Sequence, residues 1–450
     1  MSSQNRINGK SFFIRTFGCK VNQYESQAIR ELMLDAGYSE SLSKDGADIY
    51  IVNTCTVTSH SDKEARYVIN LLHRTNPAAR IVVTGCLANR GVEEVASLPG
   101  VSKIVRNEDK SRLADILEGG SSSFVNRDFN VKDDELISLK IKDFQNHSKA
   151  FLKIQDGCEN FCAYCKVPFV RGPFQSKPIE DILDETRGLV ENGFKEIILT
   201  GICLGGWGQD IFPSYAARGF GDYSPGLASV LKAIDMIPGD FRVRLSSIEP
   251  KYVTDELIEI MAGNKRICRH LHIPMQSGDD AILRRMNRPY KASDYLNIIR
   301  KAQKGIPGIA ITTDVMVGFP GEGDANFRNT ANLVKDINPL RVHIFKFSRR
   351  EGTAAYNMGP VPAGEAVDMR YAEIEAIARD TSFIFRTAFL DRSLDVLVES
   401  KREKITGFLS GYTDNYIKVR LEGPDSIVRS IVPVKITNIE YLSTTGTRLS

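Results

Sequence analysis

The chain has 450 residues, of which 42% are hydrophobic and 26% charged, and a formal net charge of +3. This length exceeds what one hydrophobic core usually serves, so we expect about three domains of an ordinary globular protein. No apolar run reaches the ~20 residues that cross a bilayer, and Met1–Lys10 lacks the apolar segment of a signal peptide. We therefore expect a cytoplasmic protein without a membrane partner, in which the eight cysteines stay reduced. The small net charge neither requires nor excludes nucleic acid.

The N-terminal part of the chain alternates short apolar runs with amphipathic stretches. Strands are predicted at Ser11–Phe17, Ile49–Val52, Ile81–Thr84 and Ser102–Val105, and helices at Asn22–Ala36, Ser59–His73 and Val92–Ser97. This alternation predicts a doubly wound, parallel α/β domain. In such sheets, ligands collect beyond the carboxyl ends of the strands.

Three of these strands end close to a cysteine, namely Cys19, Cys55 or Cys86. A lone cysteine is usually a small apolar filler, but cysteines at three strand ends would meet at one edge of the sheet. This arrangement predicts a metal site with three protein ligands and one open position. The chain has neither G-x-G-x-x-G after the first strand nor G-x4-G-K-[ST], so nucleotide phosphate binding of those kinds is not supported.

The polar residues 119–148 are interpreted as a linker with one strand near Leu136–Ile141. A short apolar strand then leads into a cysteine triplet with C-x3-C-x2-C spacing, Cys158, Cys162 and Cys165. Thiolates select zinc, copper(I) or iron–sulfur clusters, and a structural zinc site usually has four ligands. Three thiolates on a four-iron cluster leave one iron open for a cofactor that binds metal directly. A zinc knuckle or three buried thiols is the alternative.

The region after the triplet repeats βα units. Strands are predicted at Phe151–Ile154, Glu196–Thr200, Phe241–Leu245, His270–Ile273, Ile309–Val317 and Arg341–Phe347, and helices at Ile179–Asn192, Gly226–Met236, Thr254–Gly263, Asp279–Met286, Ser293–Lys304 and Asp324–Lys335. This number of units predicts an open TIM-like (β/α)6 barrel with its chemistry at the carboxyl ends of the strands. We expect His270 and His272 to form interior hydrogen bonds rather than a metal pair. Two basic clusters, Arg284–Arg288 and Arg341–Arg350, fit either a solvated face or a phosphate backbone.

The C-terminal part begins with a long predicted helix, Glu365–Phe389. Five short strands are predicted after it, at Leu394–Glu399, Lys404–Leu409, Tyr416–Val419, Ile427–Val434 and Ile436–Leu442. They predict a small antiparallel barrel of the oligonucleotide-binding type. A barrel that only packs against the rest of the protein is the alternative.

The cysteine triplet, with Tyr164 just before its third member, resembles the cluster loop of radical S-adenosylmethionine (SAM) enzymes. The resemblance implies a [4Fe-4S] cluster on Cys158, Cys162 and Cys165 whose open iron chelates SAM. An electron from this cluster then cleaves SAM to a 5′-deoxyadenosyl radical. The residues that the resemblance places in the SAM pocket are Tyr164, Thr200, Gly201, Glu249, Gln276 and Gly318. For each of them, loop or helix capping is the alternative.

Three stretches of the first domain, Gly18–Ser26, Asn53–Thr58 and Thr84–Cys86, resemble the N-terminal signature of the methylthiotransferases within that family. This resemblance implies a second [4Fe-4S] cluster, held by Cys19, Cys55 and Cys86, whose open iron carries the sulfur to be inserted. The C-terminal barrel resembles the TRAM module of RNA-modifying enzymes. The implied domains are 1–118 (cluster domain), 119–148 (linker), 149–380 (radical SAM) and 381–450 (TRAM). Cys203 and Cys268 are interpreted as ordinary packed thiols.

The first-domain stretches are most similar to the group that acts on N6-threonylcarbamoyladenosine 37 of tRNA. The resemblance implies insertion of a methylthio group at C2 of that nucleoside in the anticodon loop, with clusters and SAM rather than a catalytic side chain carrying the chemistry. It also implies an electron donor such as flavodoxin or ferredoxin, and it leaves the sulfur source open. The alternatives are isopentenyladenosine 37 of tRNA, a ribosomal protein aspartate, or an RNA-binding iron–sulfur redox sensor.

Overall fold

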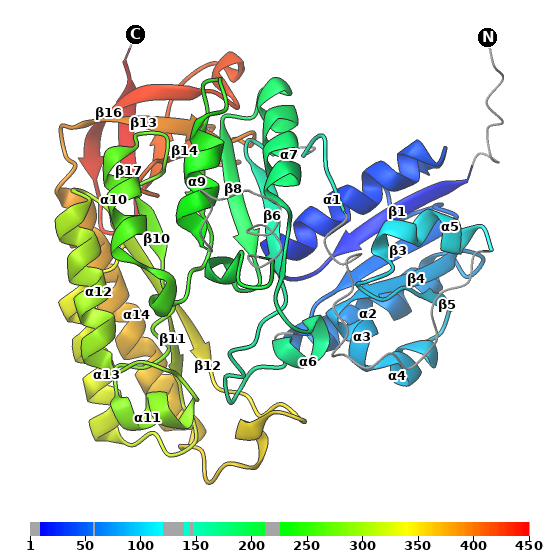
Figure 1. Ribbon diagram of the computed structural model, residues 1–450, viewed down its shortest axis with the longest axis horizontal. Coiled ribbons are helices and arrows are strands. Elements are labelled where there is room, and N and C mark those ends of the chain that lie inside the picture. Colours follow the sequence, from blue (N-terminus) through cyan, green and yellow to red (C-terminus); the bar gives the residue numbers. More distant parts are fainter. Residues whose placement is uncertain (1–9, 57–58, 120–138, 145–146, 212–225, 450) are drawn as a thin grey trace. The chain divides into compact units, whose positions relative to one another are not determined.

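The computed structural model describes residues 10–56, 59–119, 139–144, 147–211 and 226–449 (Figure 1). They form two compact units that interleave along the chain. The first unit contains Met1–Asp143, Lys153–Phe161 and Cys165–Pro178, and the second contains Phe144–Leu152, Cys162–Tyr164 and Ile179–Ser450. The division into four domains stays a prediction. None of the described helices has both the length and the apolar character that a membrane span requires.

The first unit is built on a parallel five-stranded sheet with the order β2-β1-β3-β4-β5. Its strands are β1 (Ser11–Thr16), β2 (Ser39–Glu40), β3 (Ile49–Thr54), β4 (Arg80–Gly85) and β5 (Val101–Ile104). Its helices in this part of the chain are α1 (Lys20–Asp35), α2 (Ser59–Thr75), α3 (Cys86–Arg90), α4 (Val92–Ala96) and α5 (Leu113–Leu117). The predicted doubly wound domain is confirmed. The short elements β2, α3 and α5 were not predicted, because so few residues show no periodicity.

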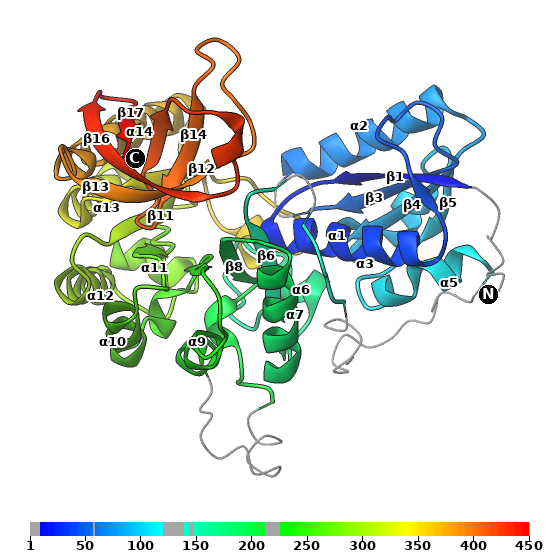
Figure 2. The same ribbon diagram turned by 90° about the horizontal axis from the view of Figure 1, so that it is seen from above.

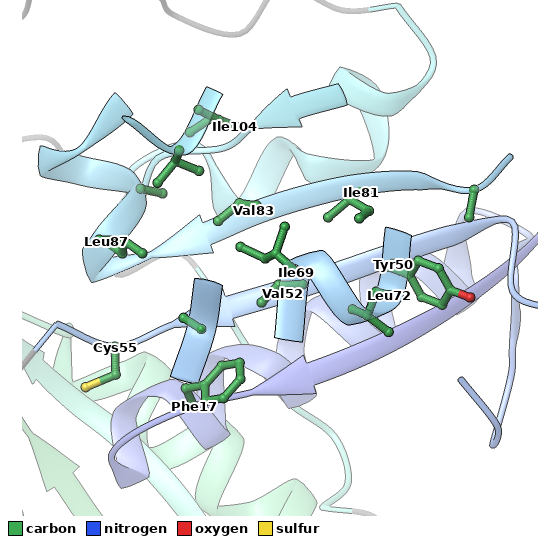
Figure 3. Close-up of a cluster of buried hydrophobic side chains, with 14 of the residues drawn as sticks. Phe17, Tyr50, Val52, Cys55, Ile69, Leu72, Ile81, Val83, Leu87 and Ile104 are labelled. Carbon is green, nitrogen blue, oxygen red and sulfur yellow. The ribbon is translucent and has the colours of Figure 1, made fainter. Parts of the chain in front are cut away.

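Helices cover both faces of this sheet, and Figure 2 shows α1 and α2 on opposite sides of it. Ile51 of β3 packs with Ile29 of α1 in one core. Its neighbour Val52 packs with Ile69 of α2 and Val83 of β4 in the other core (Figure 3). The strand β3 is buried along its whole length, and its first four residues, Ile49–Val52, form the continuous apolar run expected for a central parallel strand. The carboxyl ends of β1, β3 and β4 therefore lie side by side.

The strand β6 (Ala150–Asp156) starts in the second unit and ends in the first. In the first unit its end pairs with β7 (Gln175–Ser176), and the short helix α6 (Val167–Arg171) lies between these two strands in sequence. The described part of the predicted linker strand, residues 139–141, is not a strand, and residues 136–138 lie outside the described residues. The hydroxyl of Tyr24 donates to the carbonyl of Leu139 at 2.6 Å, which fixes this segment to the first unit.

The second unit contains the remaining βα repeats. Its parallel strands are β8 (Glu196–Gly201), β9 (Arg242–Leu245), β10 (His270–His272), β11 (Ala310–Val317) and β12 (Arg341–Lys346). The helices are α7 (Ile179–Glu191), α9 (Leu227–Asp235), α10 (Asp255–Gly263), α11 (Asp280–Arg285), α12 (Ala292–Gly305), α13 (Asp324–Ile337) and α14 (Gly364–Thr387). Parallel bridges between Val243 and Ile267 and between Ser247 and His272 join β9 to the β10 ladder. Each predicted strand and helix of the open barrel is present, and β12 lies at an edge of its sheet.

The second unit also contains a closed five-stranded barrel with the order β13-β14-β15-β17-β16. Its strands are β13 (Ser393–Val398), β14 (Leu409–Thr413), β15 (Lys418–Leu421), β16 (Ile431–Ile439) and β17 (Thr444–Arg448). The predicted barrel is confirmed, but two strand assignments were wrong. The stretch Lys404–Leu409 is mostly a turn, in which Gly407 has a positive φ of 71°.

The second wrong assignment concerns β16, which was predicted as two strands. Its buried residues Val432, Val434 and Ile436 alternate regularly with exposed ones, so the polar Lys435 is an outward-facing position and not a break. The strand β17 was missed because its sequence, TTGTR, carries no apolar residue.

A buried ion triad joins the two barrels of the second unit. The Glu196 carboxylate accepts from Arg242 Nε at 2.6 Å and from Arg244 Nε at 2.9 Å. The same guanidinium groups donate to the backbone carbonyls of Tyr412, at 2.8 Å, and Thr413, at 3.0 Å. Since Glu196 and Arg242 are the first residues of β8 and β9, the C-terminal barrel is held at the amino ends of these strands. In TIM-like barrels this end serves stability, whereas the carboxyl ends carry chemistry.

Candidate functional site

The first cysteine set follows three neighbouring strands of the first unit. Cys19 precedes α1 as its N-cap residue, Cys55 comes directly after β3, and Cys86 is the first residue of α3 after β4. Cys55 and Cys86 are buried and Cys19 is exposed. The structure thus places the three cysteines at the carboxyl edge of one sheet, as predicted. Their role as cluster ligands stays a prediction.

A glycine and an asparagine bring two of these cysteine turns together. Gly18 has a positive φ of 93°, and a Cβ on it would lie 2.6 Å from Cys55 Cβ and 2.7 Å from Cys55 Sγ. Asn22 Nδ2 donates to the carbonyl of Phe17 at 2.7 Å and to the carbonyl of Thr54 at 2.9 Å, which ties the end of β1 to the end of β3. Only glycine fits position 18, because any side chain would fill the space beside the Cys55 sulfur.

We predict that Gly18→Ala lowers the iron content of the first-unit site, because the new methyl group displaces Cys55. Gly37→Ala is a matched control, since Gly37 also has a positive φ, of 84°, but has nothing within 4 Å of its Cβ position. Both variants carry the left-handed backbone cost of about 1 kcal/mol, which a thermal unfolding curve measures. Only Gly18→Ala is expected to lose iron after anaerobic reconstitution. Equal iron loss in both variants would show that backbone strain, and not the cysteine turn, is responsible.

Five buried charges lie next to this cysteine set, and sequence reasoning missed all of them. The carboxylates are Glu25 and Asp156, and the cations are Lys110, Lys153 and Arg171. None of the five side chains is more than 1% exposed. Burial alone would raise the pKa of Glu25, but the three cations outweigh it and hold the pKa well below its usual range. The sequence offered one indication of these charges, namely their position beside the motifs. Glu25 lies within the stretch Gly18–Ser26, and Asp156 directly precedes Gly157.

Cys158 and Cys165 of the triplet loop belong to the first unit, and backbone contacts within that unit fix the conformation around them. Gly157 has a positive φ of 72°, and a Cβ on it would lie 1.7 Å from the carbonyl oxygen of Pro173. The N–H of Cys158 donates to the carbonyl of Gly172 at 3.0 Å. The N–H of Val167 donates to Cys165 Sγ at 3.4 Å. A hydrogen bond to sulfur is the kind of contact that a thiolate ligand receives.

Cys162, which belongs to the second unit, is contacted by a buried arginine. Arg288 Nη1 donates to Cys162 Sγ at 3.1 Å, and its guanidinium also pairs with Glu249. Arg288 was assigned to a basic cluster that fits phosphate, and this assignment is wrong, because the side chain is only 2% exposed. Arg350 of the other basic cluster is likewise buried. Among the described residues, no three His, Cys, Asp or Glu side chains are grouped tightly enough to hold one metal ion. In a four-iron cluster each cysteine binds a different iron, so the donor set of three thiolates fits a cluster.

The residues expected to line the SAM pocket all belong to the second unit. Thr200 and Gly201 end β8, Glu249 follows β9, Gln276 follows β10 and Gly318 follows β11. The carboxyl ends of the barrel strands carry these five residues, as the TIM-like barrel requires, whereas Tyr164 lies in the triplet loop. Their contact with SAM stays a prediction.

Two further contacts order this end of the barrel. The ring of Tyr164 lies 6.4 Å from the ring of Phe319, edge to face, next to Gly318. Gln276 and Gly318 both have positive φ, and Gln276 forms a parallel bridge with Val315. The loop that carries Cys162 and Tyr164 is therefore held to the ends of β10 and β11 within the second unit.

The two histidines of β10 form interior hydrogen bonds, as expected. His270 Nε2 and His272 Nδ1 each lie 2.9 Å from Thr312 Oγ1. A carboxylate also lies close to one of them, because Asp314 Oδ1 is 3.2 Å from His272 Nε2. Asp314 lies 42 positions after His272 in sequence, and only the β10–β11 register brings the two together.

Two family models match the chain. The model described as "Uncharacterized protein family UPF0004" matches residues 11–106, and the model of the radical SAM superfamily matches residues 152–334. Among solved structures, the radical SAM methyltransferase TsrM from Kitasatospora setae matches with a TM-score of 0.52 at 13% identity, over 77% of each chain. At this identity the match supports the radical SAM fold alone.

Relatives that match along the whole length are more informative. A threonylcarbamoyladenosine tRNA methylthiotransferase MtaB of Bacillus subtilis is 36% identical, over 95% of this chain and 93% of its own. An MtaB of Thermotoga maritima is 38% identical over 92% of both chains. A tRNA-2-methylthio-N(6)-dimethylallyladenosine synthase of Clostridium tetani is 33% identical over 97% of this chain and 96% of its own. Together with the radical SAM model, these relatives imply SAM and [4Fe-4S] clusters as cofactors. The chain therefore belongs to the methylthiotransferase family of radical SAM enzymes, in which its MtaB-like relatives are found.

Proposed function

We propose that this protein is a tRNA methylthiotransferase that converts N6-threonylcarbamoyladenosine 37 to its 2-methylthio form. The observation that carries the proposal is the presence of two separate sets of three cysteines, one at the strand ends of the first unit and one in the triplet loop. The MtaB relatives at 35–38% identity support this nucleoside over dimethylallyladenosine, for which the matching relatives are 31–33% identical.

Each set of three cysteines has its own role in the proposed reaction. When bound, a [4Fe-4S] cluster on each set and SAM would supply the radical and sulfur chemistry. Cys158, Cys162 and Cys165 would hold the cluster that binds SAM, and Cys19, Cys55 and Cys86 the cluster that carries sulfur. The chain's own side chains would hold and orient these groups: Arg288 fixes Glu249 beside Cys162. An electron donor such as flavodoxin or ferredoxin completes the proposal.

A groove in the second unit supports an RNA substrate. It has a volume of about 630 Å³ and is bordered by β12, α14 and the C-terminal barrel. Its described lining includes the cations Arg341 and Lys418 and the aromatic residues Phe345, Tyr371, Tyr416 and Tyr441. Three further arginines of the lining already have partners: Arg379 pairs with Glu375, Arg420 pairs with Glu403, and Arg386 donates to backbone carbonyls. Cations beside aromatic rings suit a phosphate backbone with unstacked bases, as an anticodon loop presents them. The groove as a whole was not predicted, because its residues come from four separate segments of the chain.

We predict that Lys418→Gln weakens tRNA binding and lowers the salt dependence of the binding constant by about one unit of logarithmic slope, since one phosphate contact is lost. Lys418 is an exposed cation of this groove. Lys304→Gln is the matched control, because Lys304 is exposed on α12 and does not line the groove. Arg402 of the C-terminal barrel is less suited to a phosphate contact, because its guanidinium donates to Asp425 and to the carbonyls of Gly407 and Gly423. Equal slopes for Lys418→Gln and Lys304→Gln would exclude the groove as the binding site.

The substrate is tested by turnover. The reconstituted, full-length protein with SAM and a reductant should methylthiolate an anticodon stem-loop that carries threonylcarbamoyladenosine, and mass spectrometry of the nucleosides detects the product. The same loop with dimethylallyladenosine is the control and should stay unmodified. Turnover of the dimethylallyl form alone would assign the protein to the other group of relatives. SAM cleavage without modification of either loop would leave the substrate proposal wrong.

A further inference from the structure

The buried network beside the first-unit cysteines carries more positive than negative charge. Three cations face two carboxylates, so the five residues sum to one positive charge. Each cation has a carboxylate partner: Lys153 and Arg171 pair with Asp156, at 2.8 Å and 3.0 Å, and Lys110 pairs with Glu25. A net charge that is buried away from water is costly unless an opposite charge lies nearby. The surplus therefore indicates that an anion belongs next to this network.

The sulfur of Cys86 occupies the position where that anion is needed. Arg171 uses its Nη groups for Glu25, Asp156 and Asn22, and its Nε donates to Cys86 Sγ at 3.2 Å. A [4Fe-4S] cluster in its oxidised state with three thiolate ligands carries one net negative charge. The net charge of the five residues thus equals the charge of such a cluster in size and opposes it in sign.

The short helix α6 places this arginine. Its first residue, Val167, donates its N–H to Cys165 Sγ, and its last residue is Arg171. Asn89 of α3, the helix that starts at Cys86, donates to the carbonyl of Val170 at 3.1 Å and so fixes the end of α6. At ~1.5 Å rise per residue, α6 is only about 6 Å long between these two residues. One rigid piece of chain therefore contacts a ligand of each cysteine set.

We propose that Arg171 is a positioning residue for the second cluster, which hydrogen-bonds the Cys86 thiolate and supplies the positive charge that the bound cluster requires. The proposal rests on the proposed function, because it assumes that Cys19, Cys55 and Cys86 hold a cluster. A hydrogen bond from a cation to a ligand sulfur stabilises the reduced cluster more than the oxidised one, so it raises the reduction potential. Outer contacts of this kind typically change metal affinity about 10–100-fold.

The test uses the full-length chain with Cys158, Cys162 and Cys165 replaced by alanine, so that only the second cluster is present. In this background, Arg171→Lys keeps the positive charge but loses the fixed Nε–H bond to Cys86. We expect its cluster to have a lower midpoint potential in a titration followed by electron paramagnetic resonance, and to lose iron to a chelator about 10–100-fold faster. Lys110→Gln is the matched control: it removes a cation from the same network, and the contacts of Lys110 are with Glu25 and Asn53.

The outcomes separate the two proposals. A background protein that binds no iron would overturn the second cluster and, with it, the role of Arg171. A cluster whose potential and iron retention change equally in Arg171→Lys and Lys110→Gln, or in neither, would overturn the role of Arg171 alone. If Arg171→Lys does not fold, the background protein with 15N-labelled arginine decides instead. Its reduced cluster should show hyperfine coupling to a guanidinium nitrogen, and the absence of that coupling overturns the proposal.

Discussion

Replacing Cys158, Cys162 and Cys165 together by alanine should halve the iron content of the reconstituted protein, from about eight to about four irons per chain. It should also abolish the cleavage of SAM, because these cysteines are the proposed ligands of the cluster whose open iron binds SAM. Iron analysis and detection of 5′-deoxyadenosine measure the two effects. Anaerobic reconstitution is required, since these clusters are exposed to oxidation.

The complementary variant replaces Cys19, Cys55 and Cys86 and should also retain about four irons. It is expected to keep the cleavage of SAM and to lose methylthio transfer. Cys203→Ser and Cys268→Ser are the controls, because both thiols are buried and burial raises the pKa of Cys268 to about 11, so that it stays protonated. Loss of a cluster in Cys203→Ser, or one zinc per chain in the unmodified protein, would contradict the assignment of two three-cysteine sites.

Glu196→Gln should destabilise the second unit by about 3–5 kcal/mol, because it leaves two buried arginines without their carboxylate. Arg242 and Arg244 would then face only backbone carbonyls of the C-terminal barrel. Trp207, the one tryptophan of the chain, is buried after β8 and reports the unfolding of this unit by fluorescence in urea. Glu256→Gln is the matched control, since Glu256 forms an exposed pair with Lys232 and should change stability by less than about 0.5 kcal/mol.

The difference between Glu196→Gln and the unmodified protein should depend on pH. Burial raises the pKa of Glu196, but Arg244 and Arg242 outweigh it and hold the pKa below its ordinary value of 4.5. A carboxylate with a depressed folded-state pKa contributes its stability above its unfolded-state pKa and loses it as the pH falls through the folded-state value. The difference should therefore be complete at pH 7 and shrink below about pH 4.5. A difference that stays constant down to pH 3 would show that the charge of Glu196 does not hold the two barrels together.

The sequence allowed the strands, helices and cysteine sets to be predicted, because each has a local pattern. Apolar runs such as Ile49–Val52 indicate buried strands, and the spacing of Cys158, Cys162 and Cys165 predicts a three-ligand loop. The prediction failed where the local pattern is weak: β17 is polar throughout, and its strand character comes from its pairing with β16.

The parts of the site that could not be predicted are contacts between distant segments. Arg171 and Cys86 are 85 positions apart, and Arg288 and Cys162 are 126 positions apart. In sequence, Arg288 belongs to a run of cations and has the character of a solvated surface residue. Arg288 is buried beside a sulfur because of the way α11 packs, and the periodicity of the sequence does not reveal this packing. Such pairs need the tertiary structure, because a charged residue has no local signal that separates a buried partner from water.

The strand β11 has a consequence for the size of the substrate. Its first residue, Ala310, packs in the core that the C-terminal barrel shares, and its last residue, Val317, precedes Gly318 of the expected SAM pocket. At ~3.3 Å per residue, these two ends are about 23 Å apart. For the proposed RNA substrate this distance sets a minimum length, because the RNA has to extend from the C-terminal barrel to the far end of β11. A free nucleoside or a very short RNA loop would contact only one of the two ends. The C-terminal barrel could then not help the protein to select it.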